Sequence, residues 1–187
     1  QTDFKRLVAY SSVNHMGFVV LGIAAAGLAA GTPEAHIAMS GAVLQMFNHG
    51  LSAAGMFFLV GVIYERTHTR NLEEFGGLFP LVPVYGGILI FMSMASLGLP
   101  GLNGFVSEFM VVRGAYPVLK IYTAVSMIGL LFTGAYILKG IAKVLHGPMN
   151  EHWAAQRGDH KLTESNTREM FVVGPRMALI LIIGIWP

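Results

Sequence analysis

Long runs without charge dominate this sequence. Residues 7–30 and 36–64 contain no acid and no strong base, and residues 118–145 form another long apolar run after Pro117. A helix needs about 20 mostly apolar residues to cross the hydrocarbon core of a bilayer. Charged residues make up only 12% of the 187 residues, whereas soluble domains carry about 25%. We therefore expect an all-α fold, a polytopic membrane helix bundle.

Residues 81–114 form a run of a different kind, too long for one ordinary span and too short for two spans with a loop. Its middle, residues 97–104, reads LGLPGLNG. Proline removes a backbone donor, and glycine permits dihedral angles that a helix does not use. Unwound backbone at membrane depth is tolerated only where protein or a water-filled cavity covers it, and such breaks mark ion sites in many transporters. We expect one broken helix that crosses the membrane once.

The basic residues between the runs predict the orientation of the chain. When the crossings are counted in order, one group of basic residues falls on the same side of the membrane. The positive-inside rule assigns that side to the cytoplasm. This group consists of Lys5, Arg6, Arg66, Arg70, Lys143, Arg157, Lys161 and Arg168, with Arg113 and Lys120 on the other side. Residues 147–169 are expected to form a loop on the cytoplasmic side, and residues 170–187 to begin a final span. Because the chain starts at Gln1 and stops in an apolar run, we expect it to be a fragment.

Glu108 is the main candidate for a functional residue, because ionisable groups inside a membrane are costly and usually serve a function. It lies about one helical turn after the break, far from either expected membrane surface. One interpretation is that the carboxylate caps the second half of the broken helix, since acids favour the first turn. The other is that it carries a proton, since neighbouring charges can switch the charge of a buried carboxyl. We favour the proton-carrying role.

A polar face follows the run of residues 36–64. Gln45, Asn48, His49 and Ser52 stand at positions i, i+3, i+4 and i+7, so they share one side of an otherwise apolar helix. Such side chains often hydrogen-bond between membrane helices, and for Gln45, Asn48 and Ser52 this packing role and a functional role are equally open. We expect His49 to transfer protons, because imidazole titrates near neutral pH and has two ring nitrogens.

Other polar residues within the runs are weaker candidates. Ser11, Asn14 and His15 repeat the same spacing on the first run, and we attribute them to helix packing. Lys139 lies deeper in the run of residues 118–145 than Lys143 does, which makes it a candidate relay cation. The alternative for such lysines is that the long side chain reaches back to the membrane surface.

Several classes of function are excluded by what the sequence lacks. Without cysteine there is no disulfide, no thiolate metal site and no iron–sulfur cluster held by cysteines. The histidines do not show a metal-ligand spacing, and no phosphate-binding loop, dinucleotide fingerprint or nucleophile elbow is present. We therefore expect no metal and no cofactor in this chain. A net charge of +2 without a basic block also argues against nucleic-acid binding.

Four segments carry a resemblance to a known family. They are residues 3–17 (DFKRLVAYSSVNHMG), 48–55 (NHGLSAAG), 64–70 (YERTHTR) and 99–109 (LPGLNGFVSEF). In these segments the chain resembles the antiporter-like subunits of respiratory complex I. The resemblance implies a subunit of fourteen spans with two inverted five-helix repeats. Residues 1–146 would then form the second repeat, the C-terminal half-channel.

The resemblance also implies a function and partners. One subunit of the family carries a glutamate on its broken helix where the sister chains L and N carry lysine, and Glu108 matches that glutamate. His49 matches the family's histidine on the preceding span, whereas Lys139 has no secure counterpart. The chain would be a non-redox, proton-translocating part of an NADH:quinone oxidoreductase in a bacterial inner membrane, surrounded by lipid and by L-like and N-like subunits. A subunit of an Mrp-type sodium/proton antiporter or of a membrane-bound hydrogenase is the alternative.

Overall fold

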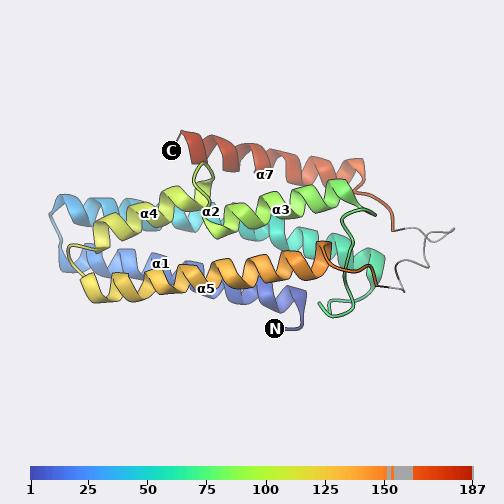
Figure 1. The fold of residues 1–187 in the computed structure, drawn as a ribbon. Helices are drawn as coiled ribbons and strands as arrows, with labels where there is room; N and C mark the ends of the chain where they lie inside the picture. The colour runs from blue at the N-terminus through green and yellow to red at the C-terminus, as the bar shows by residue number, and fades with distance from the viewer. Residues whose placement is uncertain (151–152, 154–161, 187) are drawn as a thin grey trace.

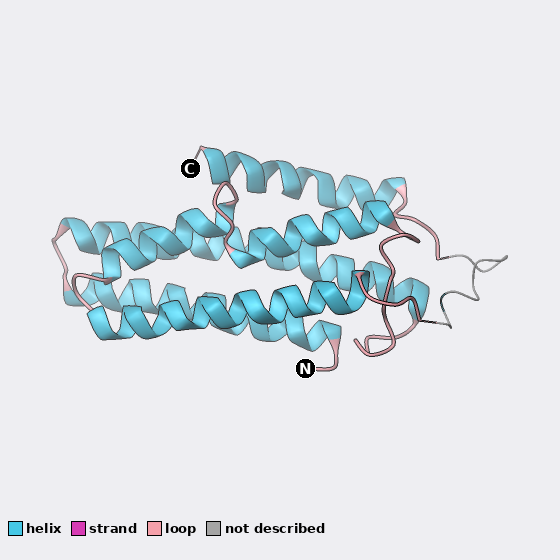
Figure 2. Cartoon of the chain, in the orientation of Figure 1, coloured by secondary structure: helices cyan, strands magenta, loops and turns pink. Residues whose placement is uncertain are grey.

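The computed structural model describes residues 1–150, 153 and 162–186. These residues form helices joined by loops and contain no β-strand (Figure 2). Three helices are long and apolar enough to cross a membrane: α1 (Phe4–Leu28), α2 (Pro33–Thr67) and α5 (Lys120–Leu145). The predicted all-α helix bundle is confirmed.

Capping side chains set where the first two helices begin. Asp3 accepts a hydrogen bond of 2.9 Å from a first-turn amide of α1, and Thr32 accepts one of 3.2 Å at the start of α2, which satisfies amides that have no partner inside the helix. Helix α2 extends beyond the expected range of 36–64 and includes Glu65 and Arg66. A helix needs apolar side chains only where it crosses hydrocarbon. The uncharged run in the sequence therefore marks the membrane-crossing part of α2 and is shorter than the whole helix.

The expected broken helix is present as two shorter helices, α3 (Pro83–Leu97) and α4 (Asn103–Ala115). Between them Gly98 and Gly101 adopt φ angles of 77° and 93°. These angles lie in the left-handed region, where glycine has no steric penalty. The break therefore depends on the backbone freedom of two particular glycines.

The helices run back and forth along one direction (Figure 1). The start of α1, the end of α2, the start of α3 and the end of α5 lie at one end of the bundle, and the ends of α1 and α4 lie at the other. The described members of the predicted cytoplasmic group lie at the first end: Lys5, Arg6, Arg66, Arg70, Lys143 and Arg168. Arg113 and Lys120, which the sequence predicts on the other side, lie at the second end. Which end faces the cytoplasm stays a prediction. Arg157 and Lys161 lie outside the described residues.

Helix α7 (Thr167–Ile185) packs beside the break. Near its end, a Cβ added to Gly184 would lie 2.3 Å from the carbonyl oxygen of Gly101, so the two backbones are in close contact. The loop between α3 and α4 projects toward α7 in Figure 1. Protein thus covers part of the unwound backbone, as a hydrocarbon environment requires.

The other end of α7 is fixed by ionic contacts. Arg66 of α2 donates to both carboxylate oxygens of Glu169, at 3.0 and 2.8 Å. Asn166 and Glu169 form a capping box, which starts the helix at Thr167 rather than near the expected residue 170. Glu164 accepts hydrogen bonds from the first amides of α3. The segment before α7 therefore joins α7 to both α2 and α3.

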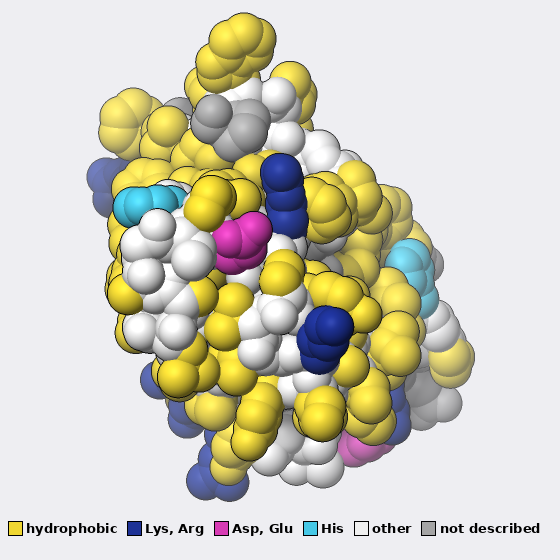
Figure 3. All heavy atoms as spheres, turned by 90° about the vertical axis from the view of Figure 1, so that its left-hand side faces the viewer, with side chains coloured by type: hydrophobic (Ala, Val, Ile, Leu, Met, Phe, Trp, Pro, Cys, Tyr) yellow, Lys and Arg dark blue, Asp and Glu magenta, His cyan; other side chains and the backbone are white. Residues whose placement is uncertain are grey.

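The outer surface of the bundle is largely apolar. Figure 3 shows mostly hydrophobic side chains, with a few charged ones between them, at the end where α1 joins α2. On α5, Ile121, Leu131 and Phe132 are 77%, 75% and 68% exposed. Side chains of this kind suit contact with lipid or with neighbouring membrane helices, and not with water.

The contact between the two half-helices is testable at Gly104. A Cβ there would lie 2.4 Å from the carbonyl oxygen of Ala95, so Gly104→Ala must push α3 and α4 apart. Overpacking of this kind costs about 1–3 kcal/mol, and we expect a lower midpoint of thermal unfolding for the purified full-length protein. Gly50→Ala is the control, because a Cβ at Gly50 meets no atom within 4 Å. Equal midpoints for the two variants would contradict the described contact.

Candidate functional site: a buried carboxylate beside the helix break

Glu108 lies in the interior of the bundle, on the second turn of α4, and is only 4% exposed. One carboxylate oxygen, Oε1, is 2.7 Å from His15 Nδ1 on α1 and accepts a hydrogen bond of 3.2 Å from Gln45 Nε2 on α2. The first turn of α4 contains no acid and no side-chain cap. The capping interpretation of Glu108 is therefore wrong, and its partners are side chains of two other helices.

The second carboxylate oxygen faces the break. A Cβ added to Gly98 would lie 3.0 Å from Glu108 Oε2. The carboxylate thus has one oxygen on the α1–α2 side and the other beside unwound backbone. This position, inside the bundle and next to the non-helical segment, fits a group that exchanges a proton with two different neighbours.

Further polar contacts hold α2 against the start of α4. Asn48 Nδ2 donates to the carbonyl oxygen of Asn103 at 2.8 Å and to Ser107 Oγ at 3.0 Å. Ser107 Oγ in turn donates to Gln45 Oε1, and Asn103 Nδ2 donates to the backbone of Asn48 at 3.2 Å. Asn48 therefore links α2 to α4. Gln45 links the same two helices and also contacts the Glu108 carboxylate. Ser52 bonds within its own helix.

His49 lies beside His15, and within the described residues no hydrogen bond joins it to Glu108. Its half-buried ring lies with its centroid 5.2 Å from that of His15. His49 also lines a small cavity of about 10 Å³ together with Ser11, Ser12 and Ser96, a volume of about one water molecule. The other described residues that line the cavity are apolar, among them Leu7, Val8 and Met56, so the His49 ring and three serine hydroxyls are its polar groups.

His15 contacts Glu108, although the spacing of Ser11, Asn14 and His15 predicts a role in helix packing alone. Asn14 does pack in this way, donating to Thr133 of α5. His15 is 2% exposed and its Nδ1 pairs with Glu108. The i, i+3, i+4 spacing identified the polar face of α1, but it gave no information on which helix that face meets.

The structure does not bring Lys139 into this cluster. Its side chain is exposed on α5, two residues from the buried Ile137 and so on the opposite side of the helix. It lies near the loop before α3, where the hydrogen bond from Lys143 lowers the pKa of the Glu73 carboxyl and the charge of Lys139 adds a smaller effect. The sequence does not show on which side of the helix Lys139 lies.

Comparisons with known proteins identify the family. Residues 1–138 match the family model described as NADH:quinone oxidoreductase/Mrp antiporter, TM. The chain belongs to this family. The predicted resemblance is thereby confirmed, and the family together with the apolar helices makes this a membrane protein.

Named relatives of this family match over the whole chain. NADH-quinone oxidoreductase subunit M of Pseudomonas aeruginosa is 40% identical over 187 residues, and the chain covers 34% of its length. Subunit M of Escherichia coli K12 is 38% identical with the same coverage, and NAD(P)H-quinone oxidoreductase chain 4 of Acaryochloris marina is 41% identical over 194 residues. The chain thus spans about one third of the length of these relatives.

A solved structure supports the same family assignment. The whole chain superposes on 36% of one chain of respiratory complex I from Thermus thermophilus with bound NADH, with a TM-score of 0.81 and 26% sequence identity.

Within the described residues, no group of three His, Asp or Glu side chains converges as a set of metal ligands.

Asn48 provides a test of the polar contacts between α2 and α4. Asn48→Leu would leave the carbonyl oxygen of Asn103 and the hydroxyl of Ser107 without this donor in a buried site. Losing such contacts costs about 1–3 kcal/mol, and we expect the free energy of unfolding in detergent to fall by that amount. Met46→Leu is the control. Met46 lies on the same turn of α2 and is 47% exposed, so this variant should change the free energy of unfolding little. A neutral Asn48→Leu would refute the stabilising role.

Proposed function

We propose that this chain is part of a proton-translocating membrane subunit of an NADH-quinone oxidoreductase, in which electron transfer in other subunits drives proton movement. The observation that carries the proposal is the Glu108 carboxylate, buried beside a helix break and held 2.7 Å from His15 Nδ1. An intramembrane carboxylate paired with an imidazole is suited to proton transfer. The names of the relatives from P. aeruginosa and E. coli support the same conclusion.

In the proposed path a proton enters from the basic end of α1. It passes the cavity lined by Ser11, Ser12 and Ser96 and reaches His49. Transfer from His49 to His15 bridges rings whose centroids are 5.2 Å apart. His15 then passes the proton from Nδ1 to Glu108 Oε1, because an imidazole can accept a proton at one nitrogen and release one from the other.

Release occurs on the other side of the carboxylate. Oε2 lies beside Gly98, so the proton leaves along the unwound segment and the start of α4. Proton transport in one direction requires that a charge arriving at the His49–His15 pair changes the proton affinity of Glu108. Nearby charges change the proton affinity of a buried carboxyl strongly. Energy comes from electron transfer in other subunits of the complex.

This function implies a location and neighbours. The chain would lie in a bacterial inner membrane, as the bacterial relatives suggest, in contact with lipid and with the L-like and N-like subunits of the membrane arm. Lys139 is exposed on α5. Its proposed relay role therefore requires contact with a neighbouring subunit and not with Glu108 directly.

The first test is Glu108→Gln in the assembled complex. The amide keeps the shape but cannot carry the proton, so we expect NADH-driven proton uptake by inverted membrane vesicles to fall at least about tenfold, given that a proton-transfer group contributes on the order of 100-fold. Subunit assembly should be preserved. The control is Glu73→Gln, which changes an exposed carboxylate outside the helices. Normal pumping by the Glu108 variant would rule out the proposed role.

The histidines provide a second test of the path. His15→Ala removes the direct partner of Glu108, and His49→Ala removes the ring behind it, so both should slow proton pumping. The loss should be larger for His15→Ala, because it also leaves the carboxylate oxygen with Gln45 as its remaining described partner. Pumping rates are compared with the amount of assembled complex. Unchanged rates in both variants would return these residues to a packing role.

The family description favours one alternative, since it includes Mrp antiporters as well as NADH:quinone oxidoreductases. The same carboxylate would then exchange protons against sodium ions. Dependence of transport on sodium, without dependence on NADH, would support the antiporter. A purely structural role of the subunit would instead leave the Glu108 and His49 variants with normal transport in either assay.

A further inference from the structure

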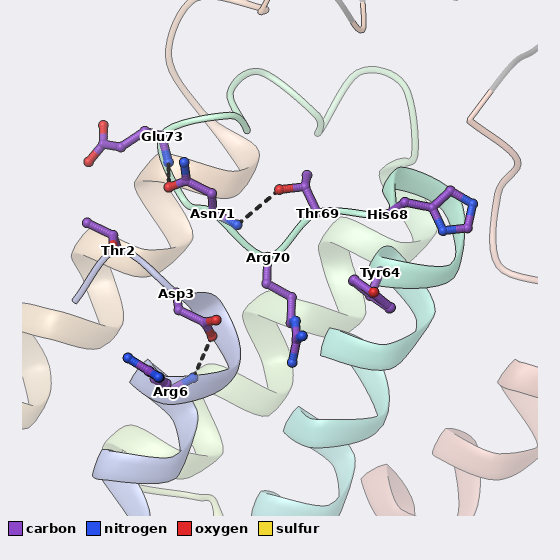
Figure 4. A pocket seen from close by; sticks show the side chains of 9 residues that line it. All are labelled: Thr2, Asp3, Arg6, Tyr64, His68, Thr69, Arg70, Asn71 and Glu73. Carbon is purple, nitrogen blue, oxygen red and sulfur yellow. Dashed lines mark hydrogen bonds between the residues drawn. The ribbon is translucent and has the colours of Figure 1, made fainter.

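A hollow opens at the basic end of the bundle, between the start of α1 and the end of α2. It has a volume of about 660 Å³, and its lining includes Asp3, Arg6, Tyr64, Arg70 and Glu73. Figure 4 shows Arg70 extending from the loop after α2 into the space between the helix of Arg6 and the helix of Tyr64. The Arg70 guanidinium lies 5.0 Å from the centroid of the Tyr64 ring.

The two acids of this hollow accept hydrogen bonds from other groups, whereas its two arginines do not pair with a carboxylate within the described residues. Asp3 caps α1, and Glu73 accepts a hydrogen bond from Lys143. Within the described part of the chain, none of Lys5, Arg6 and Arg70 forms an ion pair with a carboxylate. Arg6 and Arg70 balance Asp3 and Glu73 in the lining of the hollow, and because Lys143 pairs with Glu73 and Lys5 lies at the same end, bases outnumber acids around it.

An apolar groove continues from this hollow along α2. It has a volume of about 420 Å³, is lined by Phe57, Val60 and Gly61, and shares Tyr64 and Arg70 with the hollow, with Lys5 at the same end. From Tyr64 back to Phe57 the groove follows α2 for about 10 Å, at 1.5 Å per residue. The direction is from the end of the helix toward the middle of the span.

We propose that the hollow and the groove together bind one phospholipid with an anionic headgroup. Arginine forms paired hydrogen bonds with phosphate, and basic pockets at the ends of membrane helices recognise anionic headgroups. Tyrosine is typical of the level where headgroups meet hydrocarbon. The phosphate pairs with Arg70, which lines both the hollow and the groove, and one acyl chain lies along Phe57 and Gly61. A free phosphate ion has no chain for the groove, and a zwitterionic lipid would bring its own cation close to these basic side chains, which is unfavourable.

The test uses the assembled complex in phosphatidylcholine vesicles that contain a phosphatidylglycerol with a photoreactive group on one acyl chain. After illumination, mass spectrometry of this subunit measures labelling of the α2 segment around Gly61. We expect competition by unlabelled phosphatidylglycerol, but not by added phosphatidylcholine or inorganic phosphate. Arg70→Gln should weaken the labelling about fivefold, the factor expected for one basic residue at a membrane surface.

A second variant separates lipid from a simple anion. A Cβ at Gly61 meets no atom within 4 Å, so Gly61→Leu is accommodated by the fold but fills the groove, and it should abolish labelling with the charges unchanged. Arg113→Gln, an exposed base at the other end of the bundle, is the control and should label normally. Each of four results would overturn the proposal. These are competition by phosphatidylcholine as strong as that by phosphatidylglycerol, displacement of the probe by phosphate, normal labelling of Gly61→Leu, and the loss of all labelling because another subunit covers this face. The readout is independent of pumping, so it stands apart from the proposed function.

Discussion

The contact between Glu108 and His15 is the interaction on which the rest of this structure depends. A carboxylate inside a membrane bundle is unfavourable unless polar groups surround it. Here α1 supplies an imidazole and α2 supplies the amide of Gln45. Three helices must therefore meet at one point, and the contacts of Asn48 and Ser107 hold α2 and α4 at that point.

The break between α3 and α4 serves the same site. Gly98, the first residue after α3, lies against Glu108 Oε2, and a Cβ added there would be 3.0 Å from this oxygen. The unwound segment needs cover, and the end of α7 provides part of it at Gly184. The ion pair of Arg66 with Glu169 fixes the start of α7. An ionic contact at the end of the bundle is thus linked to the geometry of its centre.

Much of this architecture is readable from the sequence. The uncharged runs predict the long helices, and Gly98, Pro100 and Gly101 predict the break, because these are consequences of local chemistry and of the length of a bilayer span. What the sequence does not supply is the direction in which a side chain points. His15 and His49 have similar local sequences around them, yet only His15 contacts Glu108. Lys139 lies on the outer side of α5. Both outcomes depend on how the helices are rotated against each other, which local spacing does not determine.

The crossing of α2 and α4 has a consequence for how this bundle responds to charge. At Gly41 a Cβ would lie 2.7 Å from the amide nitrogen of Val111, and at Gly114 one would lie 2.4 Å from that of Ala38. Backbones in such close register cannot slide past one another without a clash. A change in the charge of Glu108 would therefore act on side chains and on the non-helical residues 98–102, because α2 and α4 cannot shift along each other to respond to it.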